Sequence, residues 1–187
     1  MRLFVAMEIP SEVRQNLASL LESLRAISRE PKWVRPENLH VTLKFLGEVA
    51  DANIEKVRSG LERIRSEQPV SLEFRGLGFF PSAKRPRVFW TGIEASLNLK
   101  MLAGDIEAAM EKCGIPRETR EFSPHLTLAR FERPALPEKL RSVIAENAHR
   151  EFGALRTNQF HLIQSKLKPS GAEYTTVARF AFAPGQS

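Results

Sequence analysis

The chain repeats itself at a fixed spacing, and this repeat restricts the folds open to it more than any other feature. His40-Val41-Thr42-Leu43 is matched by His125-Leu126-Thr127-Leu128, which begins 85 residues later. The same offset carries Arg2-Leu3-Phe4 onto Arg87-Val88-Phe89, so one gapless correspondence covers the chain from its start through the first motif. A repeat of this kind predicts two similar structural units in one chain.

The hydrophobic pattern of each half predicts the same order of elements, strand, helix, strand, helix and strand. In the first half Ser11 is expected to cap the first helix. The predicted elements are a strand over 2–9, a helix from Ser11 to Leu24, a strand from Leu39 to Leu46, a helix from Asp51 to Arg65, a strand from Val70 towards Phe80, then a strand over 87–94, a helix over 97–112, a strand over 124–131, a helix over 137–148, a strand over 154–166 and a last strand from Glu173 to Phe182.

This order of elements predicts an α+β fold. Each half is too short to bury a large core alone, so the halves are expected to share one. We therefore expect a single bilobal domain over 1–187, with pseudo-repeats of about 1–86 and 87–187. Two antiparallel sheets would flank a central cleft, with the helices on the outside.

The two histidine motifs are expected to lie on strands. Side chains alternate between the faces of a strand, so His40 and Thr42 should share one face. Val41, Leu43 and Phe45 should point the other way, into the core. The second motif follows the same alternation, so two polar platforms would face each other across the cleft.

Paired histidines suit the cleavage of a phosphodiester. One imidazole can take a proton from the attacking oxygen while the other protonates the leaving oxygen. Threonine hydroxyls beside them can donate hydrogen bonds to the phosphate. The competing interpretation, two unrelated structural histidines, is disfavoured because the motifs occupy equivalent places in the repeat. No carboxylate stands at ligand spacing near either motif, which predicts no metal site.

Charge and composition limit the kinds of binding partner and the cellular compartment that we expect. The 28 lysines and arginines against 22 acidic residues give a net charge of +6, which favours a polyanionic partner. The single cysteine excludes an internal disulfide. The apolar run at residues 3–7 is interpreted as a strand rather than a signal peptide, and no run is long enough for a membrane span. We expect a cytoplasmic monomer without a cofactor.

Several segments resemble one known family over nearly the whole chain. They are the Arg2-Leu3-Phe4-Val5-Ala6 start, the stretch from Trp33 to Gly47 around the first motif, Phe80-Pro81, Pro86 to Trp90, Pro124 to Arg130, and the segment from Gln164 through Gly171 to Tyr174. The chain resembles the two-histidine (2H) phosphoesterase superfamily, defined by paired His-x-Thr-x motifs. It is most similar to the RNA 2′,3′-cyclic phosphodiesterase branch, also called 2′-5′ RNA ligase.

The resemblance implies a substrate, a reaction and roles. Members open an RNA 2′,3′-cyclic phosphate to a 2′-phosphomonoester without metal, and can join tRNA halves through a 2′-5′ linkage. The resemblance makes His40 the proton donor and His125 the proton acceptor, with Thr42 and Thr127 holding the phosphate. The pseudo-symmetry leaves the opposite assignment of the two histidines open.

Other residues near the motifs are candidates for RNA contact. Arg130 would lie opposite the second histidine in a regular strand, although a bend at the strand end would bring it to the phosphate. Lys44 is expected on the face of the first histidine and could contact RNA. Phe45, Trp33 and Phe80 could stack on a base, with core packing as the alternative for each.

Two other functions remain open at this point. One is a 2H phosphodiesterase that acts on a small cyclic nucleotide or on an ADP-ribose cyclic phosphate. The other is an RNA-binding module that kept the duplicated fold without catalysis. The intact motifs argue against the second, and the basic charge favours an RNA substrate over a small one.

Overall fold

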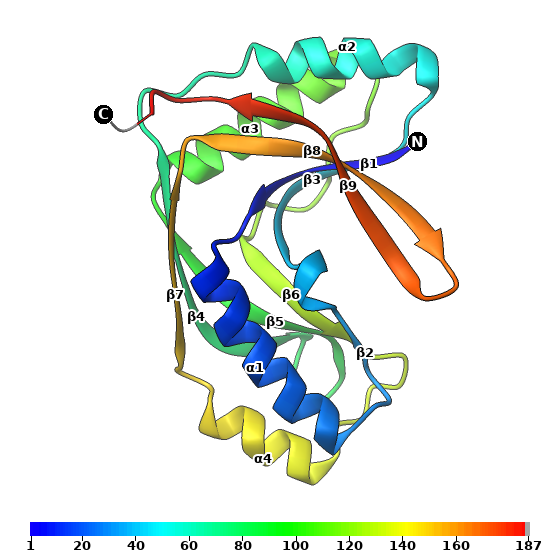
Figure 1. Ribbon diagram of the computed structural model, residues 1–187, viewed down its shortest axis with the longest axis vertical. Coiled ribbons are helices and arrows are strands. Elements are labelled where there is room, and N and C mark those ends of the chain that lie inside the picture. The colour runs from blue at the N-terminus through cyan, green and yellow to red at the C-terminus, as the bar shows by residue number, and fades with distance from the viewer. Residues whose placement is uncertain (186–187) are drawn as a thin grey trace.

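The chain forms two antiparallel sheets with helices packed outside them, in a computed structural model that describes residues 1–185 (Figure 1). The strands are β1 (Arg2–Glu8), β2 (Lys32–Trp33), β3 (His40–Glu48), β4 (Val70–Pro81), β5 (Pro86–Ala95), β6 (His125–Arg130), β7 (Glu151–Thr157), β8 (Gln159–Lys168) and β9 (Gly171–Ala181). The helices are α1 (Ser11–Ile27), α2 (Asp51–Glu62), α3 (Asn98–Lys112) and α4 (Glu138–Glu146), with a short 3-10 turn, η1 (Pro36–Asn38), before β3.

Each sheet takes strands from both halves of the sequence. The first sheet has the order β3-β1-β8-β9, so late strands complete the sheet that the first strand begins. The second sheet has the order β2-β6-β5-β4-β7, and here β2 and β4 come from the first half. The two histidine strands, β3 and β6, therefore belong to different sheets.

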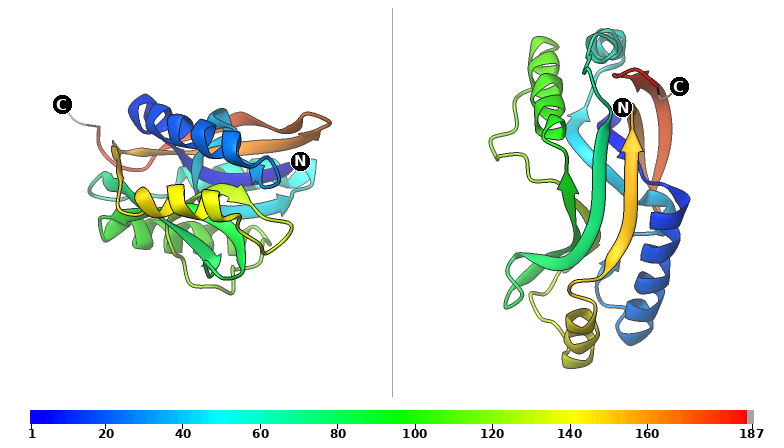
Figure 2. Two further views of the ribbon diagram at one scale, coloured as in Figure 1. Left: turned by 90° about the horizontal axis from the view of Figure 1, so that it is seen from below. Right: turned by 90° about the vertical axis from the view of Figure 1, so that its left-hand side faces the viewer.

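The helices are exchanged in the same way. Helix α1 follows a strand of the first sheet but packs against β7 of the second, beside α4. Helix α3 follows β5 of the second sheet and packs with α2 against the first sheet (Figures 1 and 2). We call the first sheet with α2 and α3 the first lobe, and the second sheet with α1 and α4 the second lobe. Among residues 1–185, no helix is both long and apolar enough to cross a membrane.

The contact between α1 and β7 is close because Gly153 lies beneath the helix. A Cβ at this position would stand 2.8 Å from Cγ2 of Val13, and Gly153 has a φ of +127°, a conformation that favours glycine. The Asn16 side chain secures the same contact by donating a hydrogen bond of 2.9 Å to the Phe152 carbonyl. Helix α1 is thereby fixed to a sheet that its own preceding strand does not join.

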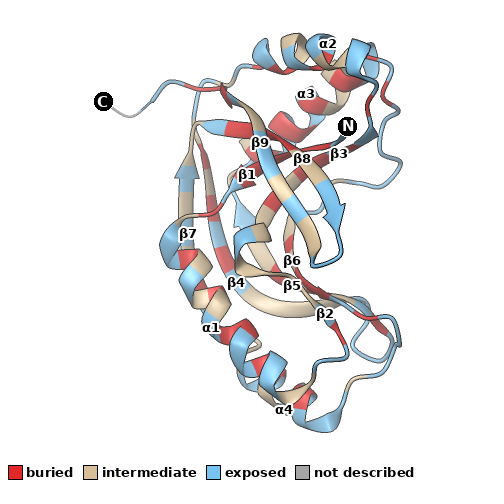
Figure 3. Ribbon diagram, turned by 45° about the vertical axis from the view of Figure 1, so that its right-hand side comes forward, coloured by how far each residue is buried: buried red, intermediate tan, exposed pale blue. Residues whose placement is uncertain are grey.

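One continuous hydrophobic core runs through both lobes (Figure 3). Its largest fully buried side chains include Phe74, Phe89, Phe152 and Phe160. A second, small cluster of Phe4, Ala6 and Ile163 packs with Tyr174. This small cluster lies beside His40, because the rings of Phe4 and Tyr174 both approach its imidazole.

The predicted α+β class, the two antiparallel sheets and the duplicated order of elements are confirmed, but two local predictions are wrong. The strand expected over 154–166 is two strands in different sheets, β7 and β8. Asn158 separates them, and its carbonyl accepts a hydrogen bond from the Phe182 amide. Ser11 does not cap α1 but begins it. Pro10, with extended backbone, holds the cap position, and its carbonyl accepts the Arg14 amide.

Candidate active site

The two histidine strands have the same burial pattern over their first six residues. His40 and Thr42 are half-buried and alternate with a fully buried Val41, as the sequence predicts. His125 and Thr127 repeat this arrangement in β6. Strands β3 and β6 also contact each other, so the two motifs lie where the lobes meet.

Each histidine ring is held by the carbonyl two residues before it. Nδ1 of His40 lies 3.0 Å from the Asn38 carbonyl oxygen, and Nδ1 of His125 lies 2.9 Å from that of Ser123. A carbonyl oxygen only accepts hydrogen bonds, so each Nδ1 carries the proton and donates it. Nε2 of each ring is therefore the atom left to exchange protons with a substrate.

Both strands contain a β-bulge directly after the threonine. In β3 the register passes from Thr42 to Lys44, and in β6 from Thr127 to Ala129. The leucines between them, Leu43 and Leu128, are the extra residues, and a bulge of one residue reverses the alternation that follows.

The bulges reverse the side-chain directions that simple alternation predicts beyond the threonines. Phe45, expected in the core, is 65% exposed and packs against Phe4 on the histidine face. Arg130 occupies the equivalent position of β6 and is also exposed. The bend considered for Arg130 is therefore present, and the prediction that Phe45 faces the core is wrong.

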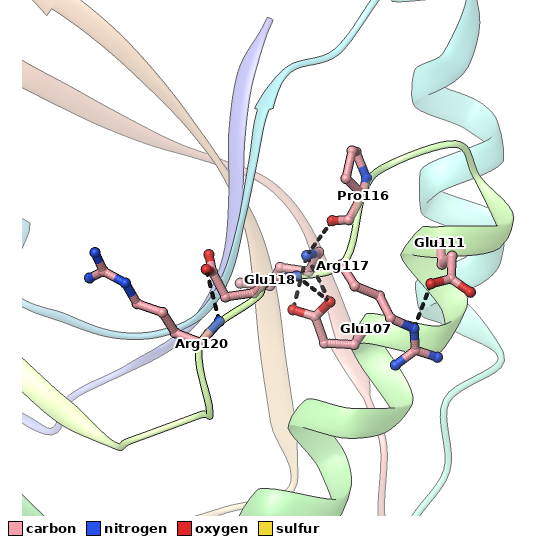
Figure 4. Close-up of polar contacts among 7 residues, drawn as sticks. Glu107, Glu111, Pro116, Arg117, Glu118 and Arg120 are labelled. Carbon is pink, nitrogen blue, oxygen red and sulfur yellow. Dashed lines mark hydrogen bonds and ion pairs between the residues drawn. The ribbon is translucent and has the colours of Figure 1, made fainter.

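The prediction that Lys44, a candidate for RNA contact, lies on the histidine face is also wrong. Lys44 is 5% exposed because the bulge turns it into the interior. Its Nζ lies 2.9 Å from both carboxylate oxygens of Glu107 and donates to the Pro116 carbonyl at 3.1 Å. Figure 4 shows Glu107 and Pro116 facing one another across this cluster.

Trp33 packs rather than facing the histidines. It pairs with the buried Ala129 in the sheet, and its ring meets Phe89 edge-on at 6.3 Å. Its indole nitrogen donates a hydrogen bond of 2.8 Å to the Ser28 carbonyl. This geometry supports the core-packing alternative for Trp33.

His40 borders a hollow lined by polar and aromatic side chains. The lining residues are Glu8, Arg14, Glu37, His40, Ile163, Tyr174 and Thr176. Burial lowers the pKa of His40 below its ordinary value of 6.5, and the positive charge of Arg14 lowers it further. The hydrogen bond to Asn38 and the charge of Glu8 oppose this shift. His40 is therefore mostly neutral near pH 7 in the free protein.

His125 lies beside an aromatic platform. The Phe80 ring meets the imidazole edge-on at 5.0 Å and packs against Trp90 at 5.3 Å. Trp90 in turn lies flat over Gly78, where any Cβ would overlap the indole ring. Phe80, for which core packing is one alternative in the sequence, is 37% exposed and lies at the site.

The two histidines have different neighbours in their sheets. His40 pairs with Glu8 of β1, whereas His125 pairs with Gly92 of β5. A constant offset of 85 would match Glu8 with Ile93, so the gapless correspondence is wrong by one residue for the first strand of each half. A carboxylate therefore stands beside one histidine and a glycine beside the other.

Sequence reasoning missed Glu8, Arg14 and Trp90. These residues reach the site through strand pairing and through the exchange of α1 between lobes, which the order of elements does not reveal. Trp90 and Tyr174 had a signal in the sequence, because both lie in segments that resemble the family.

The comparison with protein families decides the relationship. The family described as "LigT like Phosphoesterase" matches residues 7–90 and 93–174, which include both histidine motifs. The chain belongs to this family.

Relatives of this LigT-like phosphoesterase support the assignment along its whole length. A protein of Archaeoglobus fulgidus is 34% identical over 96% of this chain and 99% of its own. One of Thermus thermophilus is 35% identical over 97% of this chain and 90% of its own. Both are called RNA 2′,3′-cyclic phosphodiesterase.

Solved structures share the fold of this LigT-like phosphoesterase. The crystal structure of TT0787 of Thermus thermophilus has a TM-score of 0.81 at 33% identity and covers 97% of this chain and 98% of that one. The structure of E. coli LigT complexed with 3′-AMP has a TM-score of 0.75 at 28% identity and covers 97% of each chain.

Proposed function

We propose that this protein hydrolyses a terminal 2′,3′-cyclic phosphate of RNA to a 2′-phosphomonoester, with His40 and His125 as its acid–base pair. The observation that carries the proposal is the matched anchoring of the two rings, which frees Nε2 on both strands where the lobes meet. The names of the relatives and the net charge of +6 support RNA as the substrate.

The proposed reaction is a single displacement at phosphorus. Nε2 of His125 takes a proton from water as the water oxygen bonds to phosphorus. The bond from phosphorus to the 3′ oxygen breaks, and that oxygen takes a proton from Nε2 of His40. The hydroxyls of Thr42 and Thr127, with the Arg130 guanidinium, stabilise the charge on the non-bridging oxygens.

The environment of His40 bears on its role as the acid. Its lowered pKa leaves it mostly neutral in the free protein, but a bound phosphate places negative charge beside it. A neighbouring negative charge raises the pKa of an imidazole. Substrate binding would therefore favour the protonated form of His40, which then donates this proton. The opposite assignment, with His125 as the acid, is the pseudo-symmetric alternative.

The nucleoside of the RNA end would lie against the exposed aromatic side chains. Phe45 lies on the His40 side and Phe80 on the His125 side. Bases stack on such rings without regard to sequence. If a 5′-hydroxyl of a second RNA replaced water as the nucleophile, the same displacement would give a 2′-5′ linkage, as between tRNA halves.

The test uses an oligoribonucleotide that ends in a 2′,3′-cyclic phosphate, with EDTA present. We expect a 2′-phosphate product from the unaltered protein and a loss of about 10²–10⁴-fold in kcat/KM for His40→Ala and for His125→Ala. His149→Ala is the matched control, because His149 is exposed in the turn after α4 and should leave the rate unchanged.

Other outcomes identify the alternatives. Turnover of free 2′,3′-cyclic nucleotides without turnover of the oligoribonucleotide would assign a small substrate. Binding of the oligoribonucleotide without any product would indicate a non-catalytic RNA-binding module. Near-normal rates in either histidine variant would contradict the two-histidine mechanism.

A further inference from the structure

Lys44 connects the strand of the first histidine to the segment that leads into the strand of the second. Its ammonium binds the Glu107 carboxylate of α3 and the Pro116 carbonyl. Glu107 in turn accepts a hydrogen bond of 3.2 Å from the Glu118 amide. One buried ion pair thereby fixes the backbone at two points of the segment over 116–118 (Figure 4).

The backbone connects this ion pair to both histidines. Lys44 follows Thr42 across the bulge, so its anchor lies directly beside the His40 motif in the strand. The segment held by the pair continues to Ser123, whose carbonyl fixes the His125 ring. A displacement of this ion pair would therefore move the first motif through β3 and the second through the segment that leads to Ser123.

The other lobe supports its histidine strand differently. The equivalent of Lys44 in β6 is Ala129, which forms no ion pair, and the outer edge of β6 is covered by β2. Strand β3 lies at the edge of its sheet, so the described part of the chain provides no outer strand there. Strand β3 is instead tied to α3 and to the Pro116 carbonyl through the Lys44 side chain.

We propose that Lys44 is a positioning residue, which with Glu107 sets the placement of the His40 strand relative to the segment that carries His125. This inference rests on the proposed function of the two histidines. Lys44 is almost fully buried, so it acts through the backbone it holds and not by touching the substrate.

Positioning can be separated from stability by replacing the whole pair. Removing one partner of a buried ion pair leaves an uncompensated charge and destabilises the fold, whereas an apolar pair of similar volume is often neutral or stabilising. In Lys44→Met/Glu107→Met the fold would keep a packed interior, but the hydrogen bonds to Pro116 and Glu118 would be lost.

The experiment measures Tm, kcat and KM for Lys44→Met and for the double variant on the cyclic-phosphate oligoribonucleotide. We expect a double variant with a Tm close to that of the unaltered protein, a kcat about 100-fold lower and an unchanged KM, because small misplacements of reacting groups have effects of this size. Lys100→Met is the matched control. Its ion pair with Glu121 joins α3 to the same segment but is exposed, so kcat and Tm should not change.

Hydrogen–deuterium exchange gives a readout that does not depend on activity. We expect faster exchange over residues 116–124 in the double variant than in the unaltered protein. If the unaltered protein opens no cyclic phosphate, the proposed function fails. Hydrogen–deuterium exchange still tests whether the ion pair holds the segment over 116–118. A double variant with near-normal kcat, unchanged exchange over 116–124, or failure to fold would each overturn the positioning role.

Discussion

His161 is a buried imidazole one strand away from His40. It pairs with Ala6 of β1, whose Glu8 pairs with His40, so β1 separates the two histidines. His161 is 3% exposed, and its Nδ1 lies 3.3 Å from Oε1 of Glu8. Burial lowers the pKa of His161, while the charge of Glu8 opposes this shift. Two imidazoles on one sheet thus resist protonation in the folded state.

These two lowered pKa values predict that stability falls in mild acid. The unfolded chain binds protons at the ordinary histidine pKa of 6.5, whereas the folded chain binds them only at lower pH. Tm should therefore fall as pH drops through 6.5 and continue to fall until the lowered values are reached. Each unit of difference between the folded and unfolded pKa corresponds to about 1.4 kcal/mol, or about 3–6 °C in a chain of this size.

Scanning calorimetry between pH 8 and pH 5 measures this effect, with His161→Gln as the informative variant. The glutamine cannot gain the charge, so its Tm should depend less on pH over the same window. Parallel curves for His161→Gln and the unaltered protein would mean that His161 does not contribute.

At the scale of single elements, the platform beneath His125 depends on the absence of a side chain at Gly78. A methyl group there would overlap the Trp90 ring and force it to turn, which would displace Phe80 from the histidine. We expect Gly78→Ala to destabilise the fold by about 1–3 kcal/mol through overpacking. Chemical denaturation followed by tryptophan fluorescence measures the loss and reports the altered surroundings of Trp90.

Gly104→Ala is the matched control for this prediction. Gly104 lies in α3 with open space around it, so alanine should stabilise the helix slightly. Equal stabilities for the two glycine variants would show that Trp90 tolerates the extra methyl group.

The sequence predicts most elements to within a few residues, together with the histidine and threonine of each motif. It fails beyond the threonines because a bulge leaves no mark in the pattern of polar and apolar residues. Lys44 and Phe45 exchange the faces that simple alternation assigns to them, one buried and the other exposed. The expected register therefore holds for the motifs and reverses one residue after each.

At the scale of the whole molecule, the halves of the sequence are not the lobes of the structure. The pattern of either half is equally compatible with strands that pair within that half, so it does not predict that β4 and β8 change sheets. The pairs that decide this are remote in sequence, as Arg2 with Ser165 and Val70 with Thr157. Local patterning carries little information about such contacts.

The exchange of strands predicts how the halves behave when separated. Fragments 1–83 and 84–187, cut in the exposed turn between β4 and β5, should each remain unfolded, because each sheet would lack strands. Mixed together, they should form a complex with circular dichroism and activity like those of the intact chain. A cooperative thermal transition in either fragment alone would contradict this prediction.

The first sheet cannot be completed during synthesis until β8 and β9 have been made. Arg2 leaves the ribosome long before Ser165, the residue with which it pairs. Strand β1, which is apolar along most of its length, therefore lacks its β8 neighbour until β8 has been synthesised. Pairings of this span form slowly and leave apolar strands open to aggregation. The lobe with His40 thus becomes native after the second lobe, whose last strand ends at Thr157.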